Sequence, residues 1–227
     1  MRSASGERRS AVRDALCVQY GALVDEHTQA LARAIGERVR HERQTRRWTL
    51  DELAGATGVS RRALVNVEQG AANPSVATLL RISDALGVGL PALVEPPDSG
   101  EPTEVTVTRK GSGAVLWTSE AGGRGELVAG TSPPDVVELW EWSLGVGDRY
   151  ASDPHAPGTR ELVHVTHGRI TIVAAERSVS LSAGDAASFR GDVPHSYAHE
   201  LGKPARFVMS VFEPGVGTVL APSGGGR

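Results

Sequence analysis

The spacing of hydrophobic residues divides this 227-residue chain into two parts. In the first part, apolar side chains recur every three or four positions, as on one face of an amphipathic helix. Leu31, Ile35 and Val39 show this spacing and predict a helix over residues 28–47. A weaker repeat over residues 11–25 indicates an additional helix before it.

Two short helices joined by a tight turn are predicted over residues 49–74. Thr49 and Glu52 have the spacing of a capping box, in which each side chain accepts a hydrogen bond from the other residue's backbone N–H. Gly58 is suited to end that helix, and Ser60 is suited to cap the next one. The pattern is that of a helix-turn-helix.

Two further helices complete the predicted helical part. An apolar stripe over residues 75–86 ends at Gly87, and residues 90–93 allow one more short helix. Together with the preceding elements, these helices predict a five-helix bundle over residues 28–94.

The second part, residues 105–213, shows short alternating segments separated by glycine-rich turns, with no helical pattern between them. This arrangement predicts an antiparallel β-sandwich or barrel, so the expected fold class is α+β. Residues 95–104 fit neither period and form the expected linker, while residues 1–27 and 214–227 are an expected arm and tail. Strands are expected at residues 105–108, 115–118, 126–129, 136–144, 161–166, 169–173, 179–181, 186–189, 196–198 and 206–212.

Charge differs between the two parts. Residues 1–94 hold 13 arginines against 10 acidic residues, or +3, whereas residues 95–227 hold 11 basic against 17 acidic residues, or -6. An acidic partner such as DNA therefore fits only the first part. The single cysteine excludes an intrachain disulfide, and no run reaches the roughly 18 apolar residues that span a membrane. We expect a cytoplasmic protein without membrane association.

The central stretch of the helical part resembles the DNA-binding domain of the Cro/C1-type (xenobiotic response element, XRE) regulators, over about residues 31–93. The resemblance implies a double-stranded DNA operator as partner. One such helix contacts few base pairs, so a homodimer with two half-sites is also expected. The matching residues occur in family order and spacing: Leu53-Ala54, Gly58-Val59-Ser60, Leu64, Glu68-Gln69-Gly70, Asn73-Pro74, Leu79-Leu80 and Ala85-Leu86-Gly87-Val88.

The same resemblance implies that the helix over residues 60–68 lies in the major groove. Arg61 and Arg62 are the candidate base contacts, because arginine binds guanine in bidentate fashion, and Asn66 can reach adenine or phosphate. A solvated helix face is the alternative for these side chains, and Glu68 is expected to be a structural hydrogen-bond partner. The candidate DNA-binding residues are Ser60, Arg61, Arg62 and Asn66, with Arg43, Arg46 and Arg47 at the end of the first helix as phosphate contacts.

The second part resembles the two motifs of the cupin fold, a double-stranded β-helix barrel. The spacing from Glu161 to Gly168 and from Gly184 to His195 matches the family, but Glu161 lies one residue further from His155 than the pattern has it. The residues at motif positions are Gly147, Asp153, His155, Glu161 and Gly168, then Gly184, Arg190, Asp192, His195 and His199; Asp153 replaces the family's first histidine. The histidines expected at the surface or in turns are His164, His167 and His199.

Cupin proteins bind a divalent transition metal through histidines and a glutamate, so the resemblance implies His155, Glu161 and His195 as a candidate metal set. Two histidines and one carboxylate suit iron(II) with open positions. Strand alternation places Glu161 on one face with Val163 and Val165, the expected inward pair. The alternative is a metal-free pocket that binds a small ligand. The candidate pocket residues are His155, Glu161, His195, Tyr150 and Tyr197.

These features predict a sequence-specific, DNA-binding transcriptional regulator whose cupin domain senses a small-molecule effector or a metal. No catalytic residues are assigned, and an enzyme is not expected. The alternative is an iron-dependent oxygenase or epoxidase, since some cupin enzymes, including a phosphonate epoxidase, also carry an N-terminal helix-turn-helix domain. The intact DNA-reading surface favours the regulator.

Overall fold

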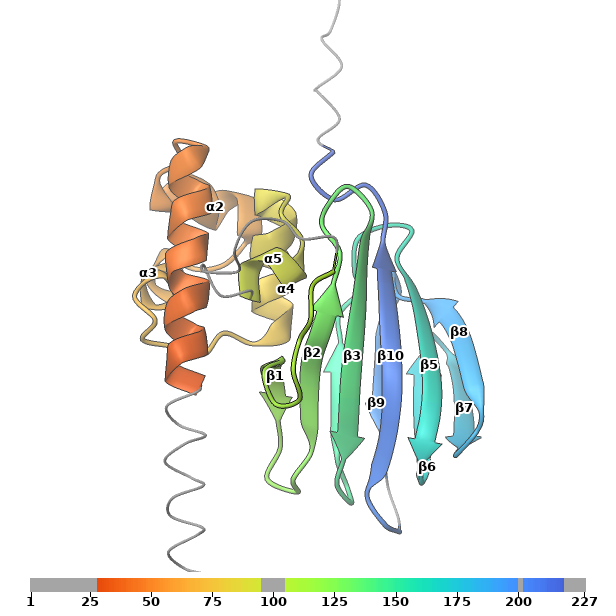
Figure 1. The fold of residues 1–227 in the computed structure, drawn as a ribbon. Helices are drawn as coiled ribbons and strands as arrows, with labels where there is room; N and C mark the ends of the chain where they lie inside the picture. Colours follow the sequence, from red (N-terminus) through yellow and green to blue (C-terminus); the bar gives the residue numbers. More distant parts are fainter. Residues whose placement is uncertain (1–27, 95–104, 200–201, 219–227) are drawn as a thin grey trace, which may run out of the picture.

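The computed structural model describes residues 28–94, 105–199 and 202–218. Within these ranges the chain forms a helical domain followed by a domain of two antiparallel sheets, which confirms the α+β class (Figure 1). The expected arm and extra helix before residue 28, the linker over residues 95–104 and the tail beyond residue 218 lie outside the described residues.

The five predicted helices are all present within the described residues. Thr49 accepts a hydrogen bond from the backbone of Glu52 and completes the capping box, and Gly58 ends the helix at a φ of 64°, in the left-handed region that favours glycine. Ser60 caps the next helix. The helices span residues 28–45, Leu50–Thr57 (α2), Arg61–Glu68 (α3), Val76–Leu86 (α4) and Leu90–Val94 (α5).

The helical core holds α3 in place against its neighbours. Leu53, Leu64 and Leu79 are fully buried, and each such side chain contributes about 1.5–3 kcal/mol of hydrophobic stabilisation. Gly36 brings the first helix unusually close to α3, because a Cβ there would lie 2.3 Å from the carbonyl oxygen of Val67. The helix that presents the candidate base contacts is thus fixed by packing on its opposite side.

Ten strands form two sheets in which every pairing is antiparallel, and the smaller sheet lies behind the larger one in Figure 1. The larger sheet has the order β1 (Ala114–Thr118), β2 (Arg124–Gly130), β3 (Val136–Leu144), β10 (Ala205–Glu213), β5 (Arg160–His167) and β8 (Ala186–Arg190). The smaller sheet has the order β4 (Arg149–Ser152), β9 (His195–Ala198), β6 (Arg169–Ala174) and β7 (Arg177–Ser182).

Two strand predictions were wrong. Residues 105–108 are not in a strand; Val105 and Val107 are 72% and 56% exposed, so their alternation does not reflect a buried face. Strand β4 was not predicted, because its four residues alternate only between exposed and half-buried positions. The other nine predicted segments each correspond to a strand.

Alternate side chains of β3 and β10 point between the two sheets and form the barrel core. Trp142 lies at its centre, with its ring 4.7 Å from that of Tyr150 and stacked on Phe207 at 6.0 Å. Val163 and Val165 point inward from β5, as predicted. This aromatic core forms the floor of the site described below.

Helices α4 and α5 lie on the side of the helical domain that faces the barrel (Figure 1). Glycines allow the two domains to approach closely: a Cβ at Gly130 would lie 2.2 Å from Pro91 of α5, and one at Gly87 would lie 2.8 Å from Gly217. The helical domain therefore touches the second domain directly through α5 and the loop between α4 and α5.

Candidate functional site

The N-terminal half of α3 presents the candidate base contacts to solvent. Arg61 lies 3.2 Å from Asp51, but both side chains are more than half exposed, so this pair costs little to break. Arg62 is exposed and forms no ion pair within the described part of the chain. Asn66 is half-buried one turn further along, and the Ser60 hydroxyl accepts a backbone hydrogen bond as the helix cap.

Arg43 has a different place from the one its sequence position suggested. Its guanidinium forms two bonds to the Glu68 carboxylate, at 2.6 and 2.8 Å, and a third to the carbonyl oxygen of Trp48 at 2.8 Å. The expectation that Glu68 is a structural partner is confirmed. Arg43 therefore ties the first helix to α3 and is not directed at DNA, so we remove it from the phosphate contacts.

Arg46 is also engaged within the helical domain. It binds the Glu42 carboxylate at 2.8 Å and the carbonyl oxygen of Leu86 at the end of α4. A cation at a helix C-terminus satisfies a carbonyl group that lacks a helical partner. Among the three arginines at the end of the first helix, Arg47 is the exposed one and stays a candidate phosphate contact.

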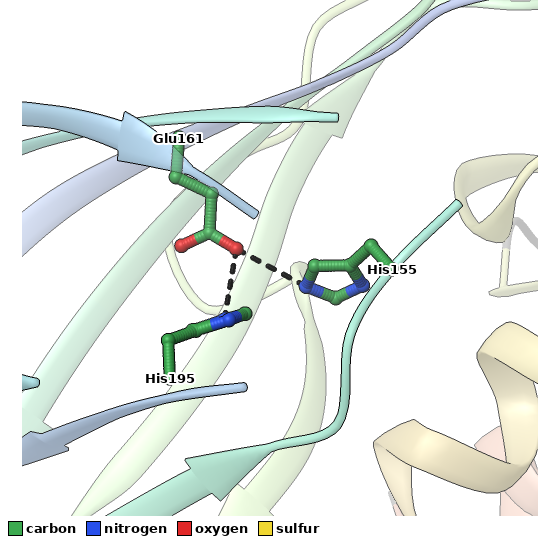
Figure 2. A group of neighbouring side chains, drawn as sticks. All are labelled: His155, Glu161 and His195. Carbon is green, nitrogen blue, oxygen red and sulfur yellow. Dashed lines mark ion pairs between the residues drawn. The ribbon is translucent and has the colours of Figure 1, made fainter. Parts of the chain in front are cut away.

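The candidate metal set is assembled from three separate segments that converge on one point (Figure 2). His155 comes from the loop after β4, Glu161 from β5 and His195 from the start of β9. The Oε1 atom of Glu161 lies 3.1 Å from Nε2 of His155 and 3.0 Å from Nε2 of His195. The extra residue between His155 and Glu161 does not prevent this convergence, because His155 lies on a loop.

Neighbouring groups orient two of these three side chains. Nδ1 of His195 lies 2.8 Å from the carbonyl oxygen of Val193, so a neutral ring carries its proton there and leaves Nε2 free as a ligand atom. The hydroxyl of Tyr197 donates to Oε2 of Glu161. The second carboxylate oxygen, Oε1, is buried and has no well-directed hydrogen bond, although both ring nitrogens are near it. Three donor atoms facing one position fit a divalent transition metal.

The charge of Glu161 is stabilised by the two imidazoles. Burial alone would raise its pKa, but His155 and His195 outweigh burial and lower the pKa of Glu161 to about 2. Burial also opposes the charge on His195, and the Glu161 carboxylate outweighs it and raises the pKa of His195. Glu161 is therefore ionised at neutral pH, the state in which a carboxylate binds a metal.

A small cavity of about 20 Å³ lies above this set, room for about one water molecule or an ion. All five predicted pocket residues line it, including Tyr150 and Tyr197. Sequence reasoning missed Glu138, which shares the inward face of β3 with two tryptophans; a charged residue at an inward position was the available signal. It also missed Val76 and Leu80 of α4, since no local pattern indicates how two domains pack.

The remaining histidines divide between surface and interior. His164 and His167 are exposed, as expected. The expectation for His199 was wrong, because it is 3% exposed and its Nδ1 atom lies 2.7 Å from the carbonyl oxygen of Arg169. It connects β6 to the segment after β9 and does not line the cavity.

Known proteins resemble both domains. The helix-turn-helix domain family matches residues 34–96, and the cupin domain family matches residues 140–212. The HTH-type transcriptional regulator SutR of Escherichia coli (strain K12) is 30% identical over 167 residues, which cover 74% of this chain and 88% of SutR.

One solved structure shares the two-domain fold. An HTH_3 family transcriptional regulator from Vibrio cholerae matches with a TM-score of 0.61 and 24% identity, over 82% of this chain and 99% of that chain. A hydroxypropylphosphonic acid epoxidase from S. wedmorenis covers 80% of this chain and 98% of its own, but its TM-score of 0.38 and 18% identity decide nothing about activity. No helix within the described residues is long and apolar enough to cross a membrane.

Proposed function

This chain belongs to the helix-turn-helix transcriptional regulators that carry a C-terminal cupin domain, and from this premise we propose that occupancy of its cupin cavity controls operator binding. The chain is a DNA-binding regulator with a cupin domain. What the cavity binds and how it acts on the DNA-binding domain are the proposed steps.

The observation that carries this proposal is the shared wall of the cavity. Val76 and Leu80 of α4 line the same cavity as the His155, Glu161 and His195 side chains. Helix α4 belongs to the DNA-binding bundle and packs against α2, the first helix of the helix-turn-helix. The cavity admits about one water molecule or one ion, so a bound ion acts on α4 through the contacting walls of the cavity and a larger ligand displaces α4. Such a displacement changes the position of the reading helix relative to the barrel.

We assign the metal site to His155, Glu161 and His195. The buried Oε1 atom of Glu161 and the orientation of His195 support this assignment. A bound divalent transition metal would supply a Lewis-acidic centre at the floor of the cavity. The three side chains would hold it, and Tyr197 orients the Glu161 carboxylate, to which its hydroxyl group donates a hydrogen bond.

Operator recognition is assigned to the exposed face of α3. Arg61, Arg62 and Asn66 contact bases in the major groove, and Arg47 contacts phosphate. Ser60 fixes the start of α3, because its hydroxyl group accepts a hydrogen bond from the backbone N–H of Ala63. The expected partner is a double-stranded operator in the cytoplasm.

A homodimer places two α3 helices on two half-sites about 34 Å apart. The outer face of the larger sheet supports such a dimer, since Val137, Leu139, Leu162 and Phe212 are 38–56% exposed on it. Leu139 and Leu162 both pair with Ser210, so these apolar residues are contiguous. An apolar patch of this kind suits a self-complementary twofold contact. Light scattering of the full chain is expected to give the dimer mass, and a monomer at micromolar concentration would contradict this assignment.

The experiment that tests the sensing proposal is an operator titration. An operator is first selected from random DNA, and its affinity is then measured for protein stripped with chelator and for protein reloaded with iron(II), manganese(II) or zinc. We expect a change of roughly 5- to 150-fold on loading, which His155→Ala and His195→Ala remove. If neither these metals nor a panel of small metabolites alters operator affinity, the sensing proposal fails.

The oxygenase alternative depends on the two-histidine, one-carboxylate set alone. Oxygen consumption by iron-loaded protein separates the two functions. Sustained uptake that requires Glu161 would favour the enzyme, whereas a metal-dependent operator affinity without uptake favours the regulator.

A further inference from the structure

Three carboxyl groups lie where the helical domain meets the barrel, apart from the metal-site residues. We call Asp84, Glu138 and Glu213 the acidic cluster; they come from α4, β3 and β10. Glu138 and Glu213 are each 2% exposed and lie on the inward faces of adjacent strands. The register places them diagonally, because Glu138 pairs with Val211 and Glu213 pairs with Val136. Asp84 is exposed, whereas buried carboxyl groups such as Glu138 and Glu213 either bind a cation or stay protonated.

No cationic partner is found within the described part of the chain. None of the three carboxyl groups forms an ion pair with an arginine or lysine there. Burial, followed by the charge of Glu213, raises the pKa of Glu138 to about 8. Burial, followed by the charge of Asp84, raises the pKa of Glu213 to about 7. Burial therefore opposes ionisation of Glu138 and Glu213, and a cation bound beside them favours it.

The side chain of Glu138 lines the cavity and is only half satisfied. Its Oε2 atom accepts a hydrogen bond from Nε1 of Trp140 at 2.8 Å, while its Oε1 atom is buried without a hydrogen-bond partner. A buried polar atom left unpaired costs about 1–3 kcal/mol, so native proteins usually satisfy it with water, an ion or a ligand.

The walls beside Glu138 are aromatic. Trp140, Trp142 and Tyr150 line the same cavity, and their rings lie 4.7–5.7 Å apart in contacting pairs. Aromatic faces attract organic cations, whereas a second metal ion would require several further oxygen or nitrogen ligands. A carboxylate beside aromatic rings is the usual chemistry of ammonium recognition.

We infer that the cavity binds the ammonium group of a small organic amine, with Glu138 as its counter-ion and the neighbouring aromatic rings as its walls. This inference rests on the proposed function, because it names the chemical class of the effector. The amine needs more room than the cavity of about 20 Å³ now provides, and movement of α4, whose Val76 and Leu80 line the cavity, supplies it. Val76 and Leu80 of α4 and Glu138 of β3 line the same cavity, so the bound amine contacts both domains at once.

Calorimetry on the full-length chain tests this inference. The probes are n-alkylamines and α,ω-diaminoalkanes of three to six carbons, compared with alcohols and carboxylates of the same length. We expect binding of one or more amines and none of the neutral or anionic analogues. Glu138→Gln keeps the shape of the side chain and removes its charge, so it is expected to weaken amine binding roughly 10- to 100-fold.

The matched control is Glu141→Gln, which removes a carboxylate from the exposed face of the same strand. It is expected to leave amine affinity unchanged. Thermal unfolding of Glu138→Gln verifies that the variant is folded. Absence of amine binding to wild type, equal binding by Glu138→Gln, or preference for the alcohols would each overturn the inference. So would uptake of a second equivalent of zinc that Glu138→Gln abolishes.

Operator titration in the presence of the best-binding amine separates this inference from the proposed function. If an alcohol or carboxylate changes operator affinity while no amine binds, the ammonium inference is wrong and the sensing function stands. If an amine binds through Glu138 and operator affinity does not change, the ammonium site is supported and the sensing function fails.

Discussion

The two domains use buried charge in opposite ways. In the helical domain, Arg43 and Glu68 are both mostly buried and satisfy each other through two short bonds. In the barrel, Glu138 is buried with one oxygen unpaired, beside the three donor atoms of the metal site. A buried charge with a partner of its own has a structural role. A buried carboxyl group without such a partner stays protonated near neutral pH unless a cation binds beside it, so Glu138 is where we expect a ligand.

The largest expected effect is the loss of stability when Arg43 is removed. Arg43→Ala leaves the Glu68 carboxylate mostly buried without its cation, which costs about 3 kcal/mol of the free energy of unfolding. Chemical denaturation measures it, with Arg47→Ala as an exposed control that is expected to change stability by less than about 0.5 kcal/mol. Equal stability of the two variants would show that the Arg43–Glu68 pair is not structural.

The next effect concerns the exposed arginines, which are free to bind DNA. Arg62→Ala is expected to cost about 1–3 kcal/mol of discrimination at one base of each half-site, without unfolding the domain. Arg47→Ala is expected to weaken binding to all sequences alike and to reduce the slope of affinity against salt by about one. Binding to a library of operator variants at several salt concentrations distinguishes these effects. Losses independent of sequence in both variants would refute the base-reading role of Arg62.

The pH dependence of stability tests whether Glu138 in the barrel is a buried, unpaired acid. The pKa of Glu138 is raised to about 8, so the folded state holds this proton more tightly than the unfolded state does. Its protonated form therefore stabilises the fold below its unfolded pKa near 4.5, and that contribution is lost as pH rises through about 8.

Metal-free wild type is accordingly expected to lose stability between about pH 5 and pH 9, and Glu138→Gln to lose less. We expect a difference of about 1–2 kcal/mol at pH 9, read from denaturant midpoints at each pH. Glu141→Gln should follow wild type throughout. Parallel curves for Glu138→Gln and wild type would mean that Glu138 is not the buried acid described.

The helical domain could be predicted almost completely from sequence because its signals are local. Thr49, Glu52, Gly58 and Ser60 act within a few residues of each other, and each has the predicted capping role. The partner of Arg43 could not be predicted from local sequence, because Glu68 lies 25 residues away. An arginine at a helix end has the same pattern whether it faces DNA or a neighbouring helix.

The residues of the barrel site could be predicted only where a family motif links positions that are far apart in the sequence. The spacing of the cupin motifs predicted that His155, Glu161 and His195 form one site. In the structure, one potential ligand atom of each residue lies within 4.8 Å of the other two. The wall formed by Leu80 depends on how α4 packs against the barrel, which hydrophobic periodicity does not encode. Hydrophobic periodicity predicts that a residue is buried. It does not predict whether the residue packs within its own domain or against the other one.

Linkage between the two domains is the central claim, and it is reciprocal: a ligand that changes operator affinity must have its own affinity changed by the operator to the same extent. The most direct measurement is therefore the affinity of the wild-type protein for manganese(II), with and without saturating operator DNA. A change of roughly 5- to 150-fold, equal to the change in operator affinity caused by the metal, is the predicted result. The same manganese affinity in both conditions would contradict the coupling of cavity and DNA-binding domain through α4.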